Sequence, residues 1–305
     1  MPGHGASPDA AIIENLVSAA LPLPWPFERE YMQLALLAAV VVGACSPLIG
    51  TFVVQKRQSL MGDGIGHVAF AGVAAGVLAG VWPVWTALAA AVLGALAVEW
   101  LRVRGGVSGD LALAVCFYGG IAAGAVLLGR ADSLDASVNT YLFGQLLTVD
   151  RGEAVVVVVL GALIIASVAI TSRALFAMAV DEEWARVAGV PVTALNTVLA
   201  VLVAVTVVAA MRVVGILLVA ALMVLPVASG QLLARSQRGI LAWSVAIGVV
   251  SAVAGLVAAR RWGLQPGGTI VLVALGFYGV LTVGRAVRRG GTPPAPITAE
   301  GALPG

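Results

Sequence analysis

Long apolar runs, separated by short polar or charged segments, fill most of this chain. A helix needs about 20 mostly apolar residues to cross the hydrocarbon core of a bilayer. Nine runs approach or exceed this length, and they cover residues 31–54, 64–82, 83–98, 111–129, 154–172, 191–211, 213–234, 239–259 and 267–284. The runs are continuous rather than alternating, which predicts helices and excludes a transmembrane β-barrel. The pattern predicts an all-α, polytopic transmembrane helical bundle of about eight to ten spans.

The remaining segments set the expected domain organisation. Residues 1–30 are predicted to be an N-terminal tail, 31–289 a transmembrane domain, and 290–305 a disordered, proline-containing C-terminal tail. No basic segment precedes an apolar core near the N-terminus, so a cleavable signal peptide is not expected. Residues 141–144 are too few to cross a bilayer, and we expect a short or re-entrant piece there.

Composition narrows the class of protein. Hydrophobic residues make up 61% of the chain and charged residues only 10%, whereas soluble domains are about 25% charged. The net charge of +2 gives no indication of nucleic-acid binding. Lys56 is the only lysine, and it follows Gln55 rather than the glycine of a Walker A loop. If ATP drives this protein, a separate chain must supply the ATPase.

Basic residues indicate the orientation of the bundle. With the amino terminus outside, the inner segments carry eleven of the lysine and arginine residues and the outer segments six. Cytoplasmic loops are normally enriched in these residues, so we predict an outer N-terminus and an inner C-terminus.

Asp63 and His67 are the strongest candidates for chemistry. An acid and an imidazole four residues apart lie on one face of a helix, where both can contact the same ion. Ionisable residues inside apolar spans are costly and are therefore functional candidates by default. His67 is one of two histidines, and the other, His4, lies in the N-terminal tail. The alternative is that Asp63 and His67 hydrogen-bond each other and fix the start of a helix.

The depth of this pair depends on the local backbone. On the predicted topology, the pair lies near the cytoplasmic start of the second span. A break at Gly62, Gly64 or Gly66 would place it deeper, because discontinuous helices often form transport sites.

A short helix is predicted in the inner segment 173–190. Asp181, Glu182 and Glu183 favour the positive end of a helix dipole, and Gly189 is a common terminating residue. Such an amphipathic helix could dock in a groove of a partner protein. A plain connecting loop is the alternative.

Other polar residues receive structural interpretations. Glu99 and Asp110 border spans near the inner surface and are interpreted as interfacial rather than as ligands. Arg212 is interpreted as an anchor at the outer surface. Cys45 and Cys116 lie in apolar runs without metal-ligand spacing, so we expect them to pack in the core.

Five segments taken together resemble a known family. Residues 47–72, 141–144, 181–189, 212–226 and 266–269 are similar, in this order, to the membrane permease of the bacterial zinc/manganese/iron ABC importers. The resemblance extends over about residues 31–286, essentially the whole predicted membrane domain.

This resemblance implies a three-component importer in the bacterial inner membrane. Its partners would be an extracytoplasmic metal-binding protein, two cytoplasmic ABC ATPase subunits, a second permease subunit that is expected to be a copy of this chain, and membrane lipid. The chain itself would not be an enzyme and would hold no permanent cofactor. Transported Zn²⁺ is the first expectation, with Mn²⁺ or iron as alternatives. Asp63 and His67 would lie on the metal path. The coupling helix would dock on the ATPase through Asp181, Glu182, Trp184, Ala185 and Gly189.

Two other transport functions stay open. A siderophore or cobalamin permease would need a wide path and no paired ligands, so Asp63 and His67 argue against it. An ion-coupled secondary carrier generally holds acids in mid-membrane, and no predicted span interior carries Asp or Glu. A membrane enzyme is not favoured, because neither H-E-x-x-H nor G-x-S-x-G occurs.

Overall fold

The structure is a computed structural model that describes residues 29–130, 136–144, 146 and 150–289. Nearly all of the two predicted tails therefore lies outside the described residues. The helices are α2 (Glu30–Gln55), α3 (Met61–Ala79), α4 (Pro83–Val103), α5 (Gly109–Leu128), α6 (Ala136–Phe143), α7 (Arg151–Val180), α8 (Glu182–Val187), α9 (Val192–Met211), α10 (Ile216–Leu233), α11 (Gln237–Trp262) and α12 (Pro266–Arg289). Within this part of the chain, nine helices are long and apolar enough to span a membrane. The prediction of an all-α polytopic bundle is confirmed.

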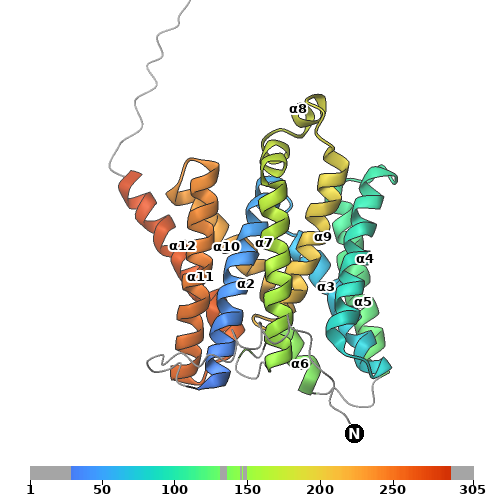
Figure 1. Cartoon of the computed structure of the whole chain (residues 1–305), viewed down its shortest axis with the longest axis vertical. Helices are drawn as coiled ribbons and strands as arrows, with labels where there is room; N and C mark the ends of the chain where they lie inside the picture. Colours follow the sequence, from blue (N-terminus) through green and yellow to red (C-terminus); the bar gives the residue numbers. More distant parts are fainter. Residues whose placement is uncertain (1–28, 131–135, 145, 147–149, 290–305) are drawn as a thin grey trace, which may run out of the picture.

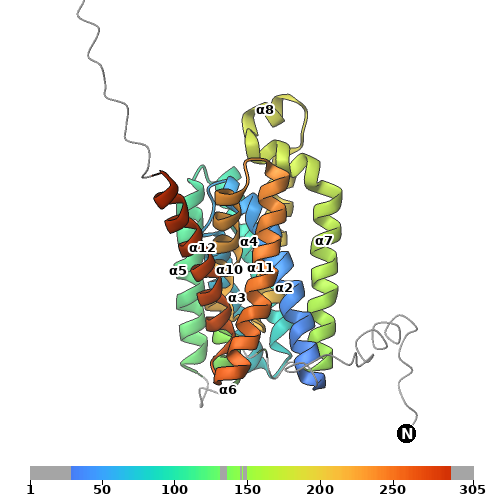
Figure 2. The ribbon, with the colours of Figure 1, turned by 90° about the vertical axis from the view of Figure 1, so that its left-hand side faces the viewer.

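The spanning helices lie side by side in an elongated bundle (Figure 1). α8 lies at one end, above α7 and α9, and α6 lies at the opposite end; these are called the α8 end and the α6 end below. α9 is the most buried span, and α3 packs against α4, α5, α9 and α10. α5 and α12 lie at opposite edges of the bundle (Figure 1) but toward the same face of it (Figure 2), and both keep most of their apolar side chains exposed.

α7 is longer than the apolar run that predicted it. We expected a span over 154–172 followed by a loop, but the helix continues to Val180. Residues 173–180 contain no proline or glycine to end it, and Leu175 and Met178 are buried against the bundle. Tertiary packing therefore extends the helix beyond the membrane-length run. By contrast, residues 141–144 do end a short helix, α6, as predicted.

Three of the segments that carry the family resemblance meet at one place at the α6 end. Gly144 and Gly215 have positive φ values of 73° and 92°, which L-residues with side chains rarely adopt. A Cβ atom on Gly144, Gly215 or Gly267 would overlap the backbone of another of these segments. We call this crossing the glycine seam, and it joins the end of α6 to the starts of α10 and α12.

A buried ion pair lies near the glycine seam. Arg212 contacts Glu153 of α7 at 2.5 Å, and its guanidinium lies 5.0 Å from the ring centroid of Tyr141 in α6. The two charged side chains are only 13% and 10% exposed. Arg212 therefore links α6, α7 and the α9–α10 turn inside the bundle, whereas we had predicted an anchor at the surface.

Candidate metal site

The site begins at the first turn of α3. Asp63 lies in this turn, where a carboxylate interacts favourably with the positive end of the helix dipole. Glycines at 62, 64 and 66 let the turn approach its neighbours. A Cβ on Gly62 would lie 3.2 Å from the sulfur of Met223 in α10, and one on Gly64 would lie 3.5 Å from Leu113 in α5. α3 remains helical through all three glycines, so the break that they would allow does not occur.

The faces of α3 determine where the candidate ligands lie. Ile65 is fully buried, whereas Asp63 and His67 are only partly buried. Because side chains at i and i+4 share a helix face, Asp63 and His67 lie together, away from Ile65. Their face opens between α5 and α10. The ring of His67 packs edge-on against Phe117 of α5, with 4.5 Å between the ring centroids.

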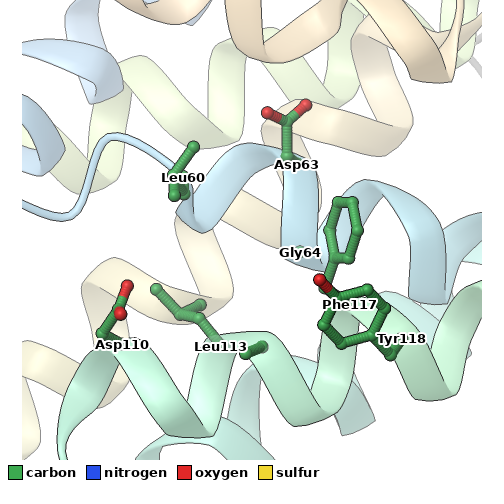
Figure 3. A pocket seen from close by; sticks show the side chains of 8 residues that line it. Leu60, Asp63, Gly64, Asp110, Leu113, Phe117 and Tyr118 are labelled. Atoms are coloured by element: carbon green, nitrogen blue, oxygen red, sulfur yellow. The ribbon is translucent and has the colours of Figure 1, made fainter.

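Asp63 lies between two hollows. One has a volume of about 370 Å³ and is lined by Leu60, Asp63 and Gly64 at the start of α3 and by Leu113 and Phe117 of α5 (Figure 3). The other, of about 320 Å³, lies between α3 and α10 and includes Leu217 and Ala221. Leu60 and Asp63 line both hollows. The carboxylate is therefore accessible from two sides of the same uncovered face.

The donor atoms of this pair are not engaged by the rest of the described chain. No hydrogen bond or ion pair joins Asp63 to His67, or joins either one to another described side chain. The alternative in which the two residues hydrogen-bond each other thus has no support in the geometry. Among the described residues, no three His, Cys, Asp or Glu side chains come together as a metal-binding group. One chain offers two ligands here, one oxygen donor and one nitrogen donor.

The site lies deeper than the predicted topology placed it. A Cβ on Gly120 of α5 would lie 2.6 Å from the backbone of His67, so these two residues are level. Gly120 is the twelfth of the 20 residues of α5, which puts His67 about 16 Å along that helix. The chain reaches this depth because α3 starts inside the bundle: both Gly50 and Gly62 pack against Met223. His67 is therefore level with the middle of α5, a helix that is long and apolar enough to span a membrane.

α8 is a separate candidate surface at the α8 end. Asp181 caps it by accepting a 2.9 Å hydrogen bond from the backbone N–H of Trp184, and Gly189 follows it with φ of 82°. Ala185 is fully buried, and Glu182 faces Lys56 at 3.2 Å. Of the five predicted coupling residues, Trp184 is the one with a large side chain that is free to contact a partner, because this side chain is 65% exposed.

The remaining sequence candidates lie apart from Asp63 and His67, except for one. Asp110 lines the α3–α5 hollow with Asp63, from the first turn of α5. Glu99 is buried and pairs with Arg102 at 2.6 Å. Cys45 and Cys116 are free cysteines, and Cys45 is buried as expected.

Comparison with known proteins identifies the family. Residues 28–284 match the ABC 3 transport family. The chain belongs to the ABC 3 transport family. This confirms the resemblance based on five ordered segments and makes the chain a multi-pass membrane protein of the transport-permease kind.

Relatives of this ABC 3 transport protein carry names of metal transporters. It is 31% identical over 245 residues to the manganese transport system membrane protein MntC of Halalkalibacterium halodurans, covering 80% of this chain and 84% of that one. It is 26% identical over 244 residues to the high-affinity zinc uptake system membrane protein ZnuB of Haemophilus influenzae, covering 80% and 93%. It also matches a solved structure of PsaBC from Streptococcus pneumoniae in complex with Fab, with a TM-score of 0.75, 28% identity and coverage of 90% and 95%.

The fold and the relatives also bear on the alternatives. Names that specify manganese and zinc transport do not favour the siderophore or cobalamin class. One argument against a secondary carrier does not hold, because the spanning helix α3 begins at Met61 and includes Asp63, which the predicted span left out. The match to the ABC 3 transport family does not favour the ion-coupled alternative.

Proposed function

We propose that this ABC 3 transport protein is the membrane-spanning subunit of an ATP-driven importer of divalent transition-metal ions. Asp63 and His67 would be the ligands along the path. The observation that carries this proposal is a carboxylate and an imidazole on one helix face inside the bundle, with no hydrogen-bond or ion-pair partner among the described residues and with Asp63 between two hollows.

The chemistry of the pair fits this cargo. A carboxylate oxygen with an imidazole nitrogen suits both Zn²⁺ and Mn²⁺. Named relatives transport manganese, zinc and, in one probable case, iron. Two ligands per chain are also appropriate for a conduit, because an ion must bind weakly enough to leave. A closed four-ligand site would trap it.

A second copy of the chain would complete the site. Asp63 and His67 face outward between α5 and α10, where Leu111, Val115 and Tyr118 of α5 are more than half exposed. A partner subunit on this face would bring two acid–imidazole pairs toward one axis. It would also cover apolar side chains that lie beside a polar site.

ATP hydrolysis would come from a separate chain docked at the α8 end. Trp184 and Val187 of α8 are 65% and 89% exposed, while buried Ala185 and the Glu182–Lys56 ion pair fix the helix to the bundle. Exposed aromatic residues on a short, fixed helix are typical anchors at protein interfaces. The outer partner would be a metal-binding protein that delivers the ion.

The test measures cellular metal content by elemental mass spectrometry in a deletion strain under metal limitation. The strain is complemented with the intact protein, with His67→Ala, or with Cys116→Ala as a control near Phe117. We expect the deletion to lower manganese or zinc, and the intact protein and Cys116→Ala to restore it. His67→Ala should assemble with the ATPase yet fail to restore the metal. Full restoration by His67→Ala would refute the site, and an unchanged metal content without another importer would refute the function.

A further inference from the structure

Lys56 occupies an unusual position for the only lysine of the chain. It follows the last residue of α2 at the α8 end, yet its side chain is only 5% exposed. Lysines at such helix ends ordinarily extend into water or toward lipid headgroups. A buried ammonium group is costly unless it is paired and hydrogen-bonded. The burial of the Lys56 ammonium group must therefore be offset by partners within the protein.

The partners of Lys56 come from the base of α8 and the start of α9. Its ammonium group lies 3.2 Å from the Glu182 carboxylate and donates a hydrogen bond to the side-chain oxygen of Asn196. Asn196 in turn donates to Glu182 at 3.3 Å, and Arg186 lies 3.7 Å from the same carboxylate. These groups form a closed triangle of Lys56, Glu182 and Asn196 that ties α8 to the end of α2.

The short connection from Lys56 to Asp63 is firmly hydrogen-bonded. The N–H groups of Arg57 and Gln58 donate to Val54 and Val53 of α2 at 3.0 Å. The N–H of Met61 donates to Gln58 at 2.8 Å, and that of Gly64 donates to Leu60 at 3.0 Å. These bonds leave little slack between Lys56 and the start of α3, so a displacement of one would move the other.

The backbone at Arg57 makes this connection sharp. Arg57 is the only non-glycine residue with positive φ among the described residues, at 58°. Non-glycine residues in this region are strained and persist where surrounding contacts hold them. The turn thus takes the chain abruptly from α2 into the first turn of α3, where Asp63 lies.

We propose that Lys56 is a positioning residue that transmits movement of α8 to the metal-binding face of α3. The triangle grips α8 through Glu182, and the hydrogen-bonded turn passes the displacement over seven residues to Asp63. This inference rests on the proposed function and adds how ATP hydrolysis at α8 would reach the ion. Lys56 contacts no metal in this scheme and acts only through Asp63.

A purely structural role is the competing interpretation, and the test must separate the two. The intact complex of permease, ATPase and metal-binding protein is reconstituted in liposomes, and Mn²⁺ or Zn²⁺ uptake is measured together with ATP hydrolysis. The variants are Lys56→Met, Glu182→Gln and the exchange Lys56→Glu with Glu182→Lys. Gln237→Ala is the control, because Gln55 donates a 2.5 Å hydrogen bond to Gln237 that ties the same end of α2 to α11 and not to α8.

We expect both single variants to assemble and hydrolyse ATP while the metal transported per ATP falls by about tenfold, within the usual range of coupling between sites. The exchange should recover a measurable part of this ratio, and Gln237→Ala should leave it unchanged. An unchanged ratio in Lys56→Met would overturn the inference. So would a loss of assembly that the exchange fails to repair. If the unaltered complex moves no metal, the proposed function fails instead, whatever the variants do.

Discussion

At the scale of single residues, the close approach of α3 and α5 makes the position of His67 sensitive to volume. Gly120 of α5 has no room for a Cβ, because it would lie 2.6 Å from the backbone of His67, which cannot move aside as a side chain can. Gly119, its neighbour, has open space around it. These two glycines therefore offer a matched pair of substitutions.

We predict that Gly120→Ala displaces His67 and lowers both metal uptake and stability. Overpacking of this kind typically costs about 1–3 kcal/mol of unfolding free energy. Thermal unfolding of the purified permease and uptake in cells measure the two effects. Gly119→Ala should leave both near the wild-type values, and an equal response of the two variants would contradict the packing argument.

The sequence could identify Asp63 and His67 but not their surroundings. Their spacing of four residues is visible directly, and so is their isolation in an apolar run. Their depth depends on where α3 begins relative to Met223, more than 150 residues away along the chain. The partners of Lys56 are equally remote: Glu182 and Asn196 carry no signal that pairs them with a lysine at the end of α2.

At the scale of elements, α8 shows how a short helix can be both fixed and exposed. Its predicted start and end were confirmed, because capping by Asp181 and termination at Gly189 are local properties of the sequence. The continuation of α7 to Val180 was missed, because it depends on burial of Leu175 and Met178 by neighbouring helices. Local signals thus define α8, while packing defines the helix that carries it.

Trp184→Ala should weaken binding of the ATPase without unfolding the permease. Truncation of an aromatic anchor at an interface commonly costs about 2 kcal/mol, or roughly 30-fold in Kd. Co-purification and binding in detergent measure the effect. Trp262→Ala is the control, because Trp262 is 66% exposed and ends α11 far from α8. Equal losses in both variants would indicate a general effect of removing surface tryptophan.

Acidification should loosen α8. Burial alone would raise the pKa of Glu182, but the charge of Lys56, with hydrogen bonds from Lys56 and Asn196 and the more distant Arg102, holds this pKa below its ordinary value. The ionised carboxylate therefore stabilises the attachment of α8 above the ordinary carboxyl pKa, and this stabilisation is lost as the pH falls through the lowered value.

Hydrogen exchange of the α8 amides, corrected for intrinsic rates, follows this loss of attachment. Protection should decrease on acidification in the wild type, whereas Glu182→Gln should show low protection that varies little with pH. A wild-type profile in Glu182→Gln would show that the carboxylate does not hold α8.

At the scale of the whole molecule, the ion pair Glu153–Arg212 joins α7 to the turn between α9 and α10. Glu153→Leu should destabilise the permease strongly, because it leaves the Arg212 guanidinium buried without its partner. Loss of one member of a buried pair costs about 3–5 kcal/mol, whereas replacing both with apolar residues is often neutral. Thermal unfolding of Glu153→Leu and of Glu153→Leu with Arg212→Met measures the difference. A double variant no more stable than the single one would assign the loss to packing alone.

The glycine seam has a consequence for biogenesis. The three backbone segments that cross there lie around residues 144, 215 and 267, so the first two leave the ribosome before the third. Domains assemble from the amino terminus during synthesis. The contact between the first two segments can form before α12 exists, but the seam is complete only after the start of α12 has been made.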